Sequence, residues 1–522
     1  MLRLLQDSLL MSVERHPERT ALIAGNVRMS YREVTDYACR LAHALRARGV
    51  RRGDRVAVFM DNTWQCALSI YGVLLAGGVF VVINAQTKRD KLAFILRDSD
   101  SRALLSEANL VRVFAPLAEQ MPALRVLCTA EFKAMPSSAE RLDDALADMP
   151  STPPPQSAIS LDLASLIYTS GSTGEPKGVM HTHQSMLFVL QSLVEYLRLE
   201  ASDRLLCVLP LAFDYGLYQW LMSVHTGAAL VLERSFAYPA QVLNVLETEG
   251  VTVFPGVPTV FAMLLAAHER EALSFVKVRR VTNTAAALPS NFNTRLREIF
   301  PNADIYRMYG LTECKRVSYL PPEQIEQKPE SVGIAIPGTE VMVLDEAGRP
   351  VQAGEVGTLY VRGSHVMSGY WNQPEKTAHM LKPGALPGER LLCTHDLFTV
   401  DEDGYLYFVG RTDDIIKSRG EKISPLEVET VLYGIQGIRE AVVLGMPDPL
   451  LGQAVIAFVS VMEAGEALSE GLIKKMCGEK LEAFMVPKQV TILPELPKNA
   501  NNKADKKALA AMLSNLSWDI AS

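Results

Sequence analysis

The sequence predicts a mixed α/β protein with a large N-terminal domain and a smaller C-terminal domain. Helical and strand patterns alternate over residues 1–110 and again over residues 160–320, which is typical of parallel sheets covered by helices. Between residues 330 and 410 the pattern changes to short strands separated by glycine, which predicts an antiparallel region such as a small barrel. The last stretch, roughly a hundred residues, is long enough to fold as a separate domain.

The first elements can be placed from the spacing of their apolar residues. Tyr31–Ala47 carries apolar side chains at helical spacing, and residues 55–60 form an apolar run that predicts a strand. Residues 62–87 carry no charge, which raises the question of a membrane span. Glycines interrupt this stretch, and residues 79–83 are β-branched and aromatic. A buried helix followed by a buried strand explains it better, so we expect no membrane span.

Further strands are predicted wherever a short apolar run lies between turn residues. In the α/β stretches these runs are residues 164–167, 205–210, 229–232 and 251–254. In the antiparallel region they are residues 341–344, 357–361 and 405–409. A charged run at residues 411–414 then breaks the pattern. We therefore expect the two domains to comprise residues 1–411 and 412–522.

The composition excludes several classes of protein. Of the 522 residues, 48% are hydrophobic and 21% are charged, as in an ordinary soluble globular protein. The net charge of −7 gives no reason to expect nucleic acid or an anionic membrane as a partner. The seven cysteines are scattered without metal-binding spacing, and the charged N-terminus lacks the features of a signal peptide. We therefore expect a cytoplasmic protein whose thiols are mostly small buried groups.

The most informative stretch is a loop that directly follows a predicted strand. Its sequence is Tyr168-Thr169-Ser170-Gly171-Ser172-Thr173-Gly174-Glu175-Pro176-Lys177-Gly178. Glycines allow the backbone to turn several N–H groups toward one point, while the hydroxyl groups and the lysine add donors and positive charge. This combination predicts phosphate binding. A solvated turn is the alternative, but such a turn rarely needs this density of donors after a strand.

The loop differs from the P-loop of nucleoside triphosphatases at the end that would hold a metal ion. Pro176 precedes Lys177, and Gly178 follows it where a P-loop has serine or threonine. The hydroxyl group that would bind Mg²⁺ is therefore missing. If a metal ion takes part, another residue must hold it.

Further motifs support nucleotide binding along most of the chain. They are residues 209–216, 282–289, 309–313, 394–396, 410–417, 420–429 and 496–503. Together with the loop, these motifs resemble those of the adenylate-forming superfamily, which includes acyl-CoA synthetases, carrier-protein-loading adenylation domains and luciferases. The resemblance implies an N-terminal domain of two parallel-type α/β subdomains and a small β-barrel. A smaller, mobile α+β domain would follow at the C-terminus.

The resemblance implies that the loop holds the phosphates of ATP. The loop residues concerned are Thr169, Ser170, Gly171, Ser172, Thr173, Gly174 and Lys177. In the motif at 309–313, Tyr309 would stack on the adenine next to Gly310. Thr312 would contact phosphate, and Glu313 would bind Mg²⁺ and so supply the metal ligand that the loop lacks. A carboxylate beside phosphate oxygens is a suitable ligand for this hard cation.

Three other motifs are similar to those that bind the ribose and line the acyl pocket in this superfamily. By resemblance, Asp396 accepts hydrogen bonds from the ribose, and Arg411 binds near the ribose or the α-phosphate. The wall between the adenine and acyl pockets would contain Thr284, Ala286 and Ala287. The family usually has glycine where this chain has Ala285 and Ala286, so we expect a narrower acyl pocket. His395 replaces a glycine beside Asp396, and we assign it no role.

The C-terminal motifs imply a domain that moves during the reaction. Asp413 falls on the position of the family's hinge. Gly420 and Lys422 lie where the family has the channel for the attacking thiol. Lys503 occupies the position of the catalytic lysine, and Asn502 stands where glycine is usual. Asparagine tolerates a left-handed backbone better than most residues, so we expect the turn before Lys503 to keep its conformation with Asn502 in place of glycine.

The acid substrate is less well defined by the sequence. The motif at 209–216 contains Phe213 and Asp214, and amino-acid-activating relatives use an aspartate here to pair with the substrate ammonium group. The same residues also occur in relatives thought to take plain acyl chains. Arg316 is a candidate ligand for a second carboxylate on the substrate. We favour the alternative that it pairs with Asp214 or another internal acid, since a buried charge needs a partner.

The reaction implied by the resemblance has two halves. A small-molecule carboxylic acid reacts with ATP and Mg²⁺ to form an acyl-adenylate, and a pantetheine thiol of CoA or of a carrier protein then takes the acyl group. Positioning and charge neutralisation by Mg²⁺ and Lys503 would suffice for catalysis, with Thr312 and Glu313 beside them. A stand-alone amino-acid adenylation enzyme and a non-catalytic AMP-binding protein are the alternatives. The oligomeric state stays open between monomer and homodimer.

Overall fold

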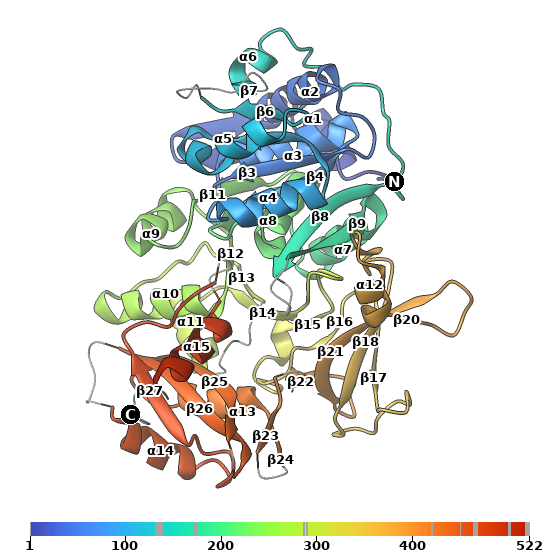
Figure 1. Cartoon of the computed structure of the whole chain (residues 1–522). Helices are drawn as coiled ribbons and strands as arrows, with labels where there is room; N and C mark the ends of the chain where they lie inside the picture. Colours follow the sequence, from blue (N-terminus) through green and yellow to red (C-terminus); the bar gives the residue numbers. More distant parts are fainter. Residues whose placement is uncertain are drawn as a thin grey trace.

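The computed structural model describes residues 2–130, 139–170, 176–284, 288, 291–412, 414–418, 421–448, 450–462, 468–499 and 503–516. In these ranges the strands form two large sheets of nine and eight strands and two smaller sheets of five strands each. The two large sheets and their helices make up the bulk of the molecule (Figure 1). The third sheet lies at one side of this body, and the fourth is built from the C-terminal part of the chain (Figure 1).

The nine-stranded sheet is parallel in its centre and antiparallel at its edges. Its order is β16 (Ile334–Ala335), β15 (Ser318–Leu320), β14 (Asp304–Tyr309), β13 (Arg280–Asn283), β12 (Val253–Gly256), β10 (Arg204–Cys207), β11 (Ala229–Leu232), β1 (Thr20–Ala24) and β2 (Val27–Ser30). Strands β14 to β1 pair in parallel, whereas β15, β16 and β2 pair antiparallel. Parallel strands are buried on both faces, which explains why β10, β11 and β12 consist mostly of apolar residues.

The eight-stranded sheet carries the predicted phosphate loop. Its order is β19 (Gly369–Tyr370), β9 (Pro176–Thr182), β8 (Leu163–Ser170), β4 (Val79–Asn84), β3 (Arg55–Met60), β5 (Ser101–Ser106), β6 (Arg125–Cys128) and β7 (Ala139–Arg141). Strands β8 and β9 form an antiparallel hairpin in which Thr169 lies opposite Lys177 and Ser170 opposite Pro176. The hairpin therefore brings the two ends of the phosphate loop side by side.

Helices cover both large sheets and join them through one hydrophobic core. They are α1 (Asp7–Arg15), α2 (Tyr31–Ala47), α3 (Trp64–Ala76), α4 (Arg89–Asp98), α5 (Val111–Gln120), α6 (Leu142–Leu146), α7 (His183–Tyr196), α8 (Asp214–Thr226), α9 (Pro239–Thr248), α10 (Pro258–Arg270) and α11 (Asn291–Ile299), with short 3₁₀ turns η1 (Ala108–Leu110) and η2 (Pro322–Gln324). Buried residues of α2, α3, α7 and α8 belong to the same cluster as residues from strands of both sheets. These helices thus hold the two sheets together.

The third sheet is antiparallel, as expected for this part of the sequence. It has the order β17 (Glu340–Leu344), β18 (Gly357–Arg362), β21 (Arg390–Val400) and β20 (Leu381–Pro383), with β22 (Leu406–Arg411) also paired to β21 and helix α12 (Pro374–Met380) between β19 and β20. Strand β21 is long and pairs with three neighbours. Its pairing with β22 places Asp396 opposite Arg411.

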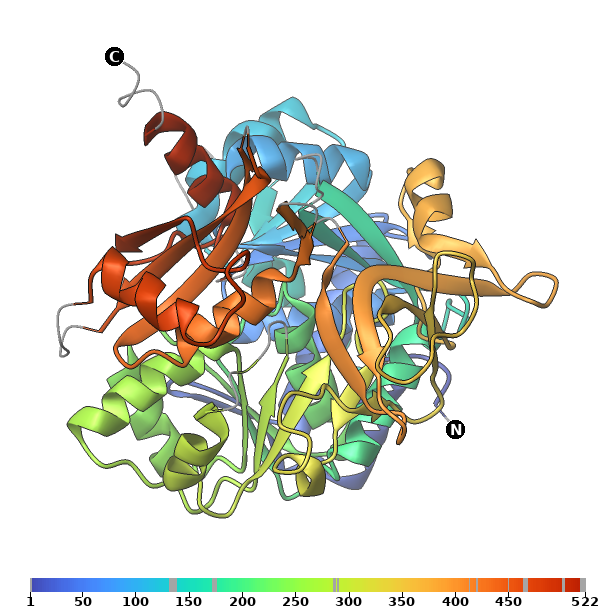
Figure 2. The same cartoon turned by 90° about the horizontal axis from the view of Figure 1, so that it is seen from below.

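The fourth sheet forms the C-terminal domain. Its order is β24 (Glu421–Ile423), β23 (Ile416–Ser418), β26 (Gly452–Val461) and β25 (Ile438–Asp448), with β27 (Gln489–Leu493) parallel to β26 and helices α13 (Pro425–Tyr433), α14 (Glu470–Gly478) and α15 (Lys506–Leu516) packed around it. Seen from below, this domain and the third sheet lie side by side over the large sheets (Figure 2). The chain after β27 returns toward the large sheets, and this return brings Lys503 to them.

The structure confirms the predicted fold class of parallel-type α/β sheets, an antiparallel region and a smaller C-terminal domain. The helix Tyr31–Ala47 and the strand Arg55–Met60 have the predicted bounds. The uncharged stretch forms helix α3 and strand β4, and no helix in the described ranges has the length and apolar character needed to cross a membrane. All seven cysteines are free and buried. The domain boundary at 411/412 and the mobility of the second domain stay predictions.

The packing between α8 and α3 can be tested at Trp220. Its side chain is fully buried, its Nε1–H donates to the Ala67 carbonyl at 2.9 Å, and its ring meets Tyr71 edge-on. We expect Trp220→Ala to lower the free energy of unfolding by about 3–5 kcal/mol, because it leaves a cavity between the helices. Urea unfolding followed by circular dichroism measures this loss.

The exposed Tyr238, of which 76% is accessible, is the matched aromatic control. We expect Tyr238→Ala to change the free energy of unfolding by less than about 0.5 kcal/mol. Equal losses for the two variants would contradict the assignment of Trp220 as the contact that joins α8 to α3.

Candidate active site

Three residues expected at the nucleotide converge at the junction of the nine-stranded sheet and the third sheet. The Tyr309 hydroxyl at the end of β14 donates a hydrogen bond to Asp396 Oδ2. Arg411 is the last residue of β22, and its Nε donates a hydrogen bond to Asp396 Oδ1 over 3.1 Å. Burial raises the pKa of Asp396, while the bonds from Tyr309 and Arg411 oppose this shift. The arrangement presents an aromatic ring, a carboxylate and a guanidinium group together, as a nucleoside site requires.

His395 adopts a backbone conformation that favours glycine. His395 has a φ of 56°, which lies in the left-handed region that glycine adopts without strain. Its ring stacks on His379 with the centroids 4.5 Å apart. The strained backbone turns the following residue, Asp396, toward Tyr309. We still assign His395 no role in binding.

The predicted metal ligand Glu313 lies in a cluster with Lys177 and Tyr370. Lys177 Nζ is 3.2 Å from Glu313 Oε1, and the Tyr370 hydroxyl donates to the same oxygen at 2.6 Å. Lys177 also donates to the Tyr370 hydroxyl at 2.6 Å. Lys177 comes from the phosphate-loop hairpin, so this cluster joins the loop to the turn after β14.

The residues present fit a magnesium ion that is held mainly by a nucleotide. Glu313 is only 7% exposed, and no group of three or more acidic, histidine or cysteine side chains suited to a metal occurs in the part of the chain that the structure describes. Mg²⁺ commonly takes one or two carboxylates and completes its octahedral shell with substrate phosphates and water. A single buried carboxylate beside the hairpin predicted to bind phosphate matches that pattern.

The described part of the phosphate loop contains one buried hydroxyl group without a hydrogen-bond partner. The Thr169 hydroxyl is buried at the end of β8 and forms no hydrogen bond with the described residues. Such an orphaned polar group is costly unless a ligand pairs with it. Thr169 and Lys177 therefore flank the loop with one hydroxyl and one ammonium group.

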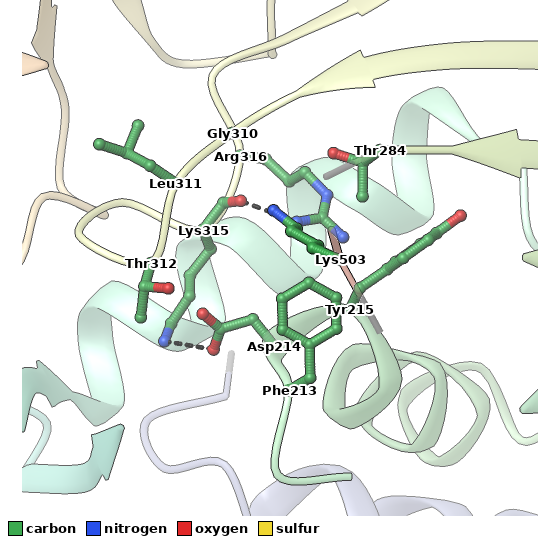
Figure 3. Close-up of a pocket in the computed structure, with 10 residues that line it drawn as sticks. All are labelled: Phe213, Asp214, Tyr215, Thr284, Gly310, Leu311, Thr312, Lys315, Arg316 and Lys503. Carbon is green, nitrogen blue, oxygen red and sulfur yellow. Dashed lines mark hydrogen bonds and ion pairs between the residues drawn. The ribbon is translucent and has the colours of Figure 1, made fainter. Parts of the chain in front are cut away.

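A pocket of about 70 Å³ includes Gly310 and Thr312, which adjoin Tyr309 and Glu313 in the chain. Figure 3 shows the side chains that line it. It is lined by Phe213, Asp214, Tyr215, Thr284, Gly310, Leu311, Thr312, Lys315, Arg316 and Lys503. Of the predicted substrate and catalytic side chains, Phe213, Asp214, Thr284, Thr312 and Arg316 meet here with Lys503. Glu313 is not among the lining residues, and Ala286 lies outside the described residues. Lys503 comes from the C-terminal domain, and its Nζ lies 6.0 Å from the centre of the Phe213 ring. The pocket is therefore completed by both domains.

Asp214 forms a buried ion pair with Lys315. The Lys315 Nζ is 2.7 Å from Asp214 Oδ1, and the two side chains are 0% and 6% exposed. Burial lowers the pKa of Lys315, and the Asp214 carboxylate opposes that shift. Lys315 has a φ of 67°, an uncommon conformation for a residue with a side chain. The ion pair holds this strained turn in place.

Gly310 is required where the turn folds back on itself. A Cβ atom at Gly310 would overlap the carbonyl oxygen of Lys315 and lie 2.9 Å from the Cα of Arg316. Only glycine permits this approach, so the turn after β14 presents Lys315 and Arg316 to the pocket. The need for glycine here is steric, in addition to any contact with the adenine.

Arg316 differs from the expectation that an internal acid pairs with it. Its Nη1 donates to the Lys315 carbonyl at 2.7 Å, and its guanidinium group lies 5.0 Å from the centre of the Tyr215 ring. Asp214 is bound to Lys315 instead, and no other acid among the described residues forms an ion pair with Arg316. The expected pairing of Arg316 with Asp214 was therefore wrong, because the neighbouring Lys315 is better placed to reach Asp214.

The surroundings of Lys503 shift its proton equilibrium. Desolvation by the surrounding protein and the positive charge of Arg411 lower its pKa to about 8, while Asp396 opposes this shift. Part of the residue is nevertheless accessible to solvent. Lys503 is therefore close enough to Asp396 and Arg411 to interact with their charges.

Several predicted site residues lie outside the described residues. They are Gly171, Ser172, Thr173, Gly174, Ala286, Ala287, Asp413 and Gly420. The side chains of Ser170 and Lys422 also lie outside them, although the backbones of both belong to strands. The roles suggested for these residues in phosphate binding, the pocket wall, the hinge and the thiol channel stay predictions.

The structure adds three residues that the sequence analysis did not place in the site. Lys315 neutralises Asp214, Tyr370 binds Glu313, and His181 Nε2 donates to the Thr312 carbonyl at 2.8 Å. Burial lowers the pKa of His181 well below its ordinary value, so this ring is neutral. Lys315 was adjacent to a recognised motif, and a lysine next to an arginine there could have indicated a buried acid nearby.

Comparison with known proteins agrees with this geometry. The model of the AMP-binding enzyme family matches residues 9–371, and the model of the AMP-binding enzyme C-terminal domain matches residues 427–503. A long-chain-fatty-acid–CoA ligase of Bacillus subtilis (strain 168) is 30% identical over 97% of this chain and 94% of its own length.

Two other relatives show the range of the similarity. Tyrocidine synthase 3 of Brevibacillus parabrevis is 31% identical over 95% of this chain, which corresponds to 7% of that long protein. The crystal structure of an anthranilate CoA ligase in complex with anthranoyl-AMP superposes with a TM-score of 0.90 at 28% identity, covering 98% of each chain. The chain therefore belongs to the AMP-binding enzyme family, within the adenylate-forming superfamily that includes the acyl-CoA synthetases.

Proposed function

We propose that the protein activates a carboxylic acid with ATP to an acyl-adenylate and then transfers the acyl group to a pantetheine thiol. The observation that carries this proposal is the meeting of Lys503 with the pocket around Phe213 and Arg316, beside the cluster of Tyr309 and Asp396. A cation from the C-terminal domain thus lies where an acid and a nucleotide would meet. A non-catalytic binding protein would not need this arrangement.

The first half of the reaction needs orientation and charge neutralisation. An oxygen of the acid attacks the α-phosphorus of ATP, and the bond from that phosphorus to the pyrophosphate oxygen breaks. The attacking carboxylate is already an anion, so no base has to remove a proton. Lys503 neutralises negative charge at the reacting groups, while Thr169 and Lys177 contact the departing pyrophosphate. Asp396 and Tyr309 orient the nucleoside.

A magnesium ion bound beside Glu313 would supply further neutralisation of phosphate charge. The chain's own contribution is to hold the Glu313 carboxylate in one orientation through the Tyr370 hydroxyl. Lys177, which pairs with Glu313 in this structure, is free to turn toward phosphate when the carboxylate takes another partner.

The second half transfers the acyl group to sulfur. A thiolate attacks the acyl carbon, and the bond from that carbon to the AMP oxygen breaks, which yields a thioester and AMP. Rotation of the C-terminal domain about Asp413 would withdraw Lys503 and open a thiol channel near Gly420 and Lys422, as in a hinge closure used twice. Separate assays with free CoA and with a phosphopantetheinylated carrier protein would identify the acceptor.

We expect Lys503→Ala to reduce adenylation by about 10²–10³-fold, since it removes a charge that acts on the transition state. Pyrophosphate–ATP exchange with a panel of fatty, aryl and amino acids measures this step. Lys488→Ala is the matched control, because Lys488 lies in the same domain and pairs with Asp448 outside the pocket. Undiminished exchange in the Lys503→Ala variant would contradict the assignment, and an absence of exchange with every acid would contradict the proposed function.

The pKa of Lys503 predicts the pH dependence of the first half-reaction. The ammonium form is present below a pKa of about 8 and is lost as the pH rises through that value. We therefore expect kcat/KM for adenylation, which reports the free enzyme, to fall above about pH 8. In Lys503→Arg this decline should move to higher pH, because arginine keeps its charge. An identical alkaline decline in both proteins would show that another group titrates.

Amino-acid adenylation is the second candidate, and Asp214 is the residue that favours it. In this structure Lys315 already neutralises the Asp214 carboxylate, which reduces its capacity to bind a substrate ammonium group. A plain or anionic acid therefore agrees better with the site. The charged lining also disfavours a long alkyl chain, because such a chain would leave charged groups without water or partners.

We expect Asp214→Asn to lower the free energy of unfolding by about 3–5 kcal/mol, since Lys315 would remain buried without its counter-ion. The loss of exchange activity should be similar for amino acids and for plain acids. Thermal and urea unfolding measure the first effect, and exchange assays measure the second. The double variant Asp214→Ala/Lys315→Met should recover part of the stability. A loss confined to amino acids would instead support pairing of Asp214 with a substrate ammonium group.

A further inference from the structure

Arg316 is a buried cation that lacks a counter-ion among the residues that the structure describes. It is 4% exposed, and its contacts are the Lys315 carbonyl and the face of the Tyr215 ring. Its Nε–H has no hydrogen-bond partner within the described residues. Neither a carbonyl nor an aromatic face neutralises the charge fully, and an unpaired buried charge is strongly unfavourable. The guanidinium group therefore lacks an anionic partner among the described residues.

The nearest acid is not available to Arg316. Asp214 lines the same pocket, but its carboxylate is bound to Lys315 at 2.7 Å. The pocket thus contains one negative and three positive side chains, Asp214 against Lys315, Arg316 and Lys503. Lys503 faces Asp396 and Arg411, at the end where the nucleotide binds. Asp214 neutralises Lys315, and Asp396 lies near Lys503. Among the described residues, no carboxylate of the pocket neutralises Arg316.

A second unpartnered group lies in the same pocket. The Thr284 side chain is 2% exposed, and its hydroxyl has no partner in the described part of the chain. Figure 3 shows the Arg316 guanidinium group between Thr284 and Tyr215, directed into the pocket. A guanidinium and a hydroxyl group together can satisfy a planar anion such as a carboxylate.

We propose that Arg316 binds a second anionic group of the acid substrate, so that the enzyme selects acids with a carboxylate in addition to the one that reacts. This inference rests on the proposed activation of a carboxylic acid. The reacting carboxylate lies toward Lys503 and the nucleotide. The second carboxylate accepts hydrogen bonds from Arg316 and Thr284 and neutralises the charge of Arg316. Tyr215 supports the guanidinium group from behind, since its own hydroxyl is bound to Thr282. The small pocket restricts the spacer to a short or planar one.

Matched pairs of acids test this selectivity in the unaltered protein. Pyrophosphate–ATP exchange is measured for butyrate against succinate, valerate against glutarate, and benzoate against phthalate. We expect the diacid to exceed its partner in kcat/KM by roughly a hundredfold in at least one pair, because only the diacid pairs with the buried charge. Exchange that favours the monoacid in every pair would overturn the inference and leave the proposed function standing. No exchange with any acid would overturn both.

Substitutions of Arg316 separate binding of the acid from binding of ATP. We expect Arg316→Gln to raise the KM of the preferred diacid roughly a hundredfold, with a smaller effect on the monoacid and on the KM of ATP. Arg316→Lys should recover part of the loss, since it keeps a positive charge. An increase confined to the KM of ATP would show that the guanidinium group serves phosphate, and would overturn the inference.

Arg280→Gln is the control for the loss of a buried arginine. Arg280 is 8% exposed and pairs with Asp203 at the other end of β13, outside the pocket. This variant should lose stability and keep the preference between diacid and monoacid. An equal change of preference in Arg280→Gln and Arg316→Gln would contradict the inference. If Arg316→Gln does not fold, the matched acids still decide the matter, because that comparison needs no variant.

Discussion

The buried ion pair between Asp214 and Lys315 is the interaction on which the pocket depends. Asp214 begins helix α8, which packs between the two large sheets, and Lys315 lies in the turn that follows β14. The pair therefore fixes a core helix to the turn that carries Tyr309 and Glu313, the residues predicted to bind the nucleotide and the metal ion. It also holds Lys315 in a left-handed conformation that an unpaired lysine would avoid. The direction of Arg316 follows from that conformation.

The site is divided between segments that are distant in the sequence. Tyr309, Asp396 and Arg411 come from the meeting of two sheets, whereas Glu313 contacts Lys177 across the phosphate-loop hairpin. Lys503 arrives from the C-terminal domain. Next to these contacts, three cations and one carboxylate line a small cavity, namely Lys315, Arg316, Lys503 and Asp214. This charge distribution suits a reaction between anions, because two anions approach only where protein charges offset their repulsion.

Much of the fold could be predicted because its periodic patterns are strong. The bounds of α2 and β3 agree with the apolar spacing, and α3 and β4 explain the uncharged stretch at 62–87. Local motifs also indicated the nucleotide residues, and the structure brings Tyr309, Asp396 and Arg411 into contact. The roles of Tyr370 and His181 could not be predicted, since neither belongs to a motif with a recognisable spacing and both act through tertiary contacts.

The choice of ionic partners was decided by the tertiary structure. From the residues alone, Asp214 and Arg316 were two opposite charges near one pocket, and pairing between them was the simplest expectation. In the folded protein Asp214 pairs with Lys315 instead. The backbone of residues 315 and 316 packs against Gly310, and this turn directs the lysine side chain inward. The amino-acid sequence thus determined the class of fold, the order of the motifs and the family. The arrangement of side chains around the pocket depends on packing between elements, which no local sequence pattern encodes. The same packing leaves Arg316 without an ionic partner among the described residues.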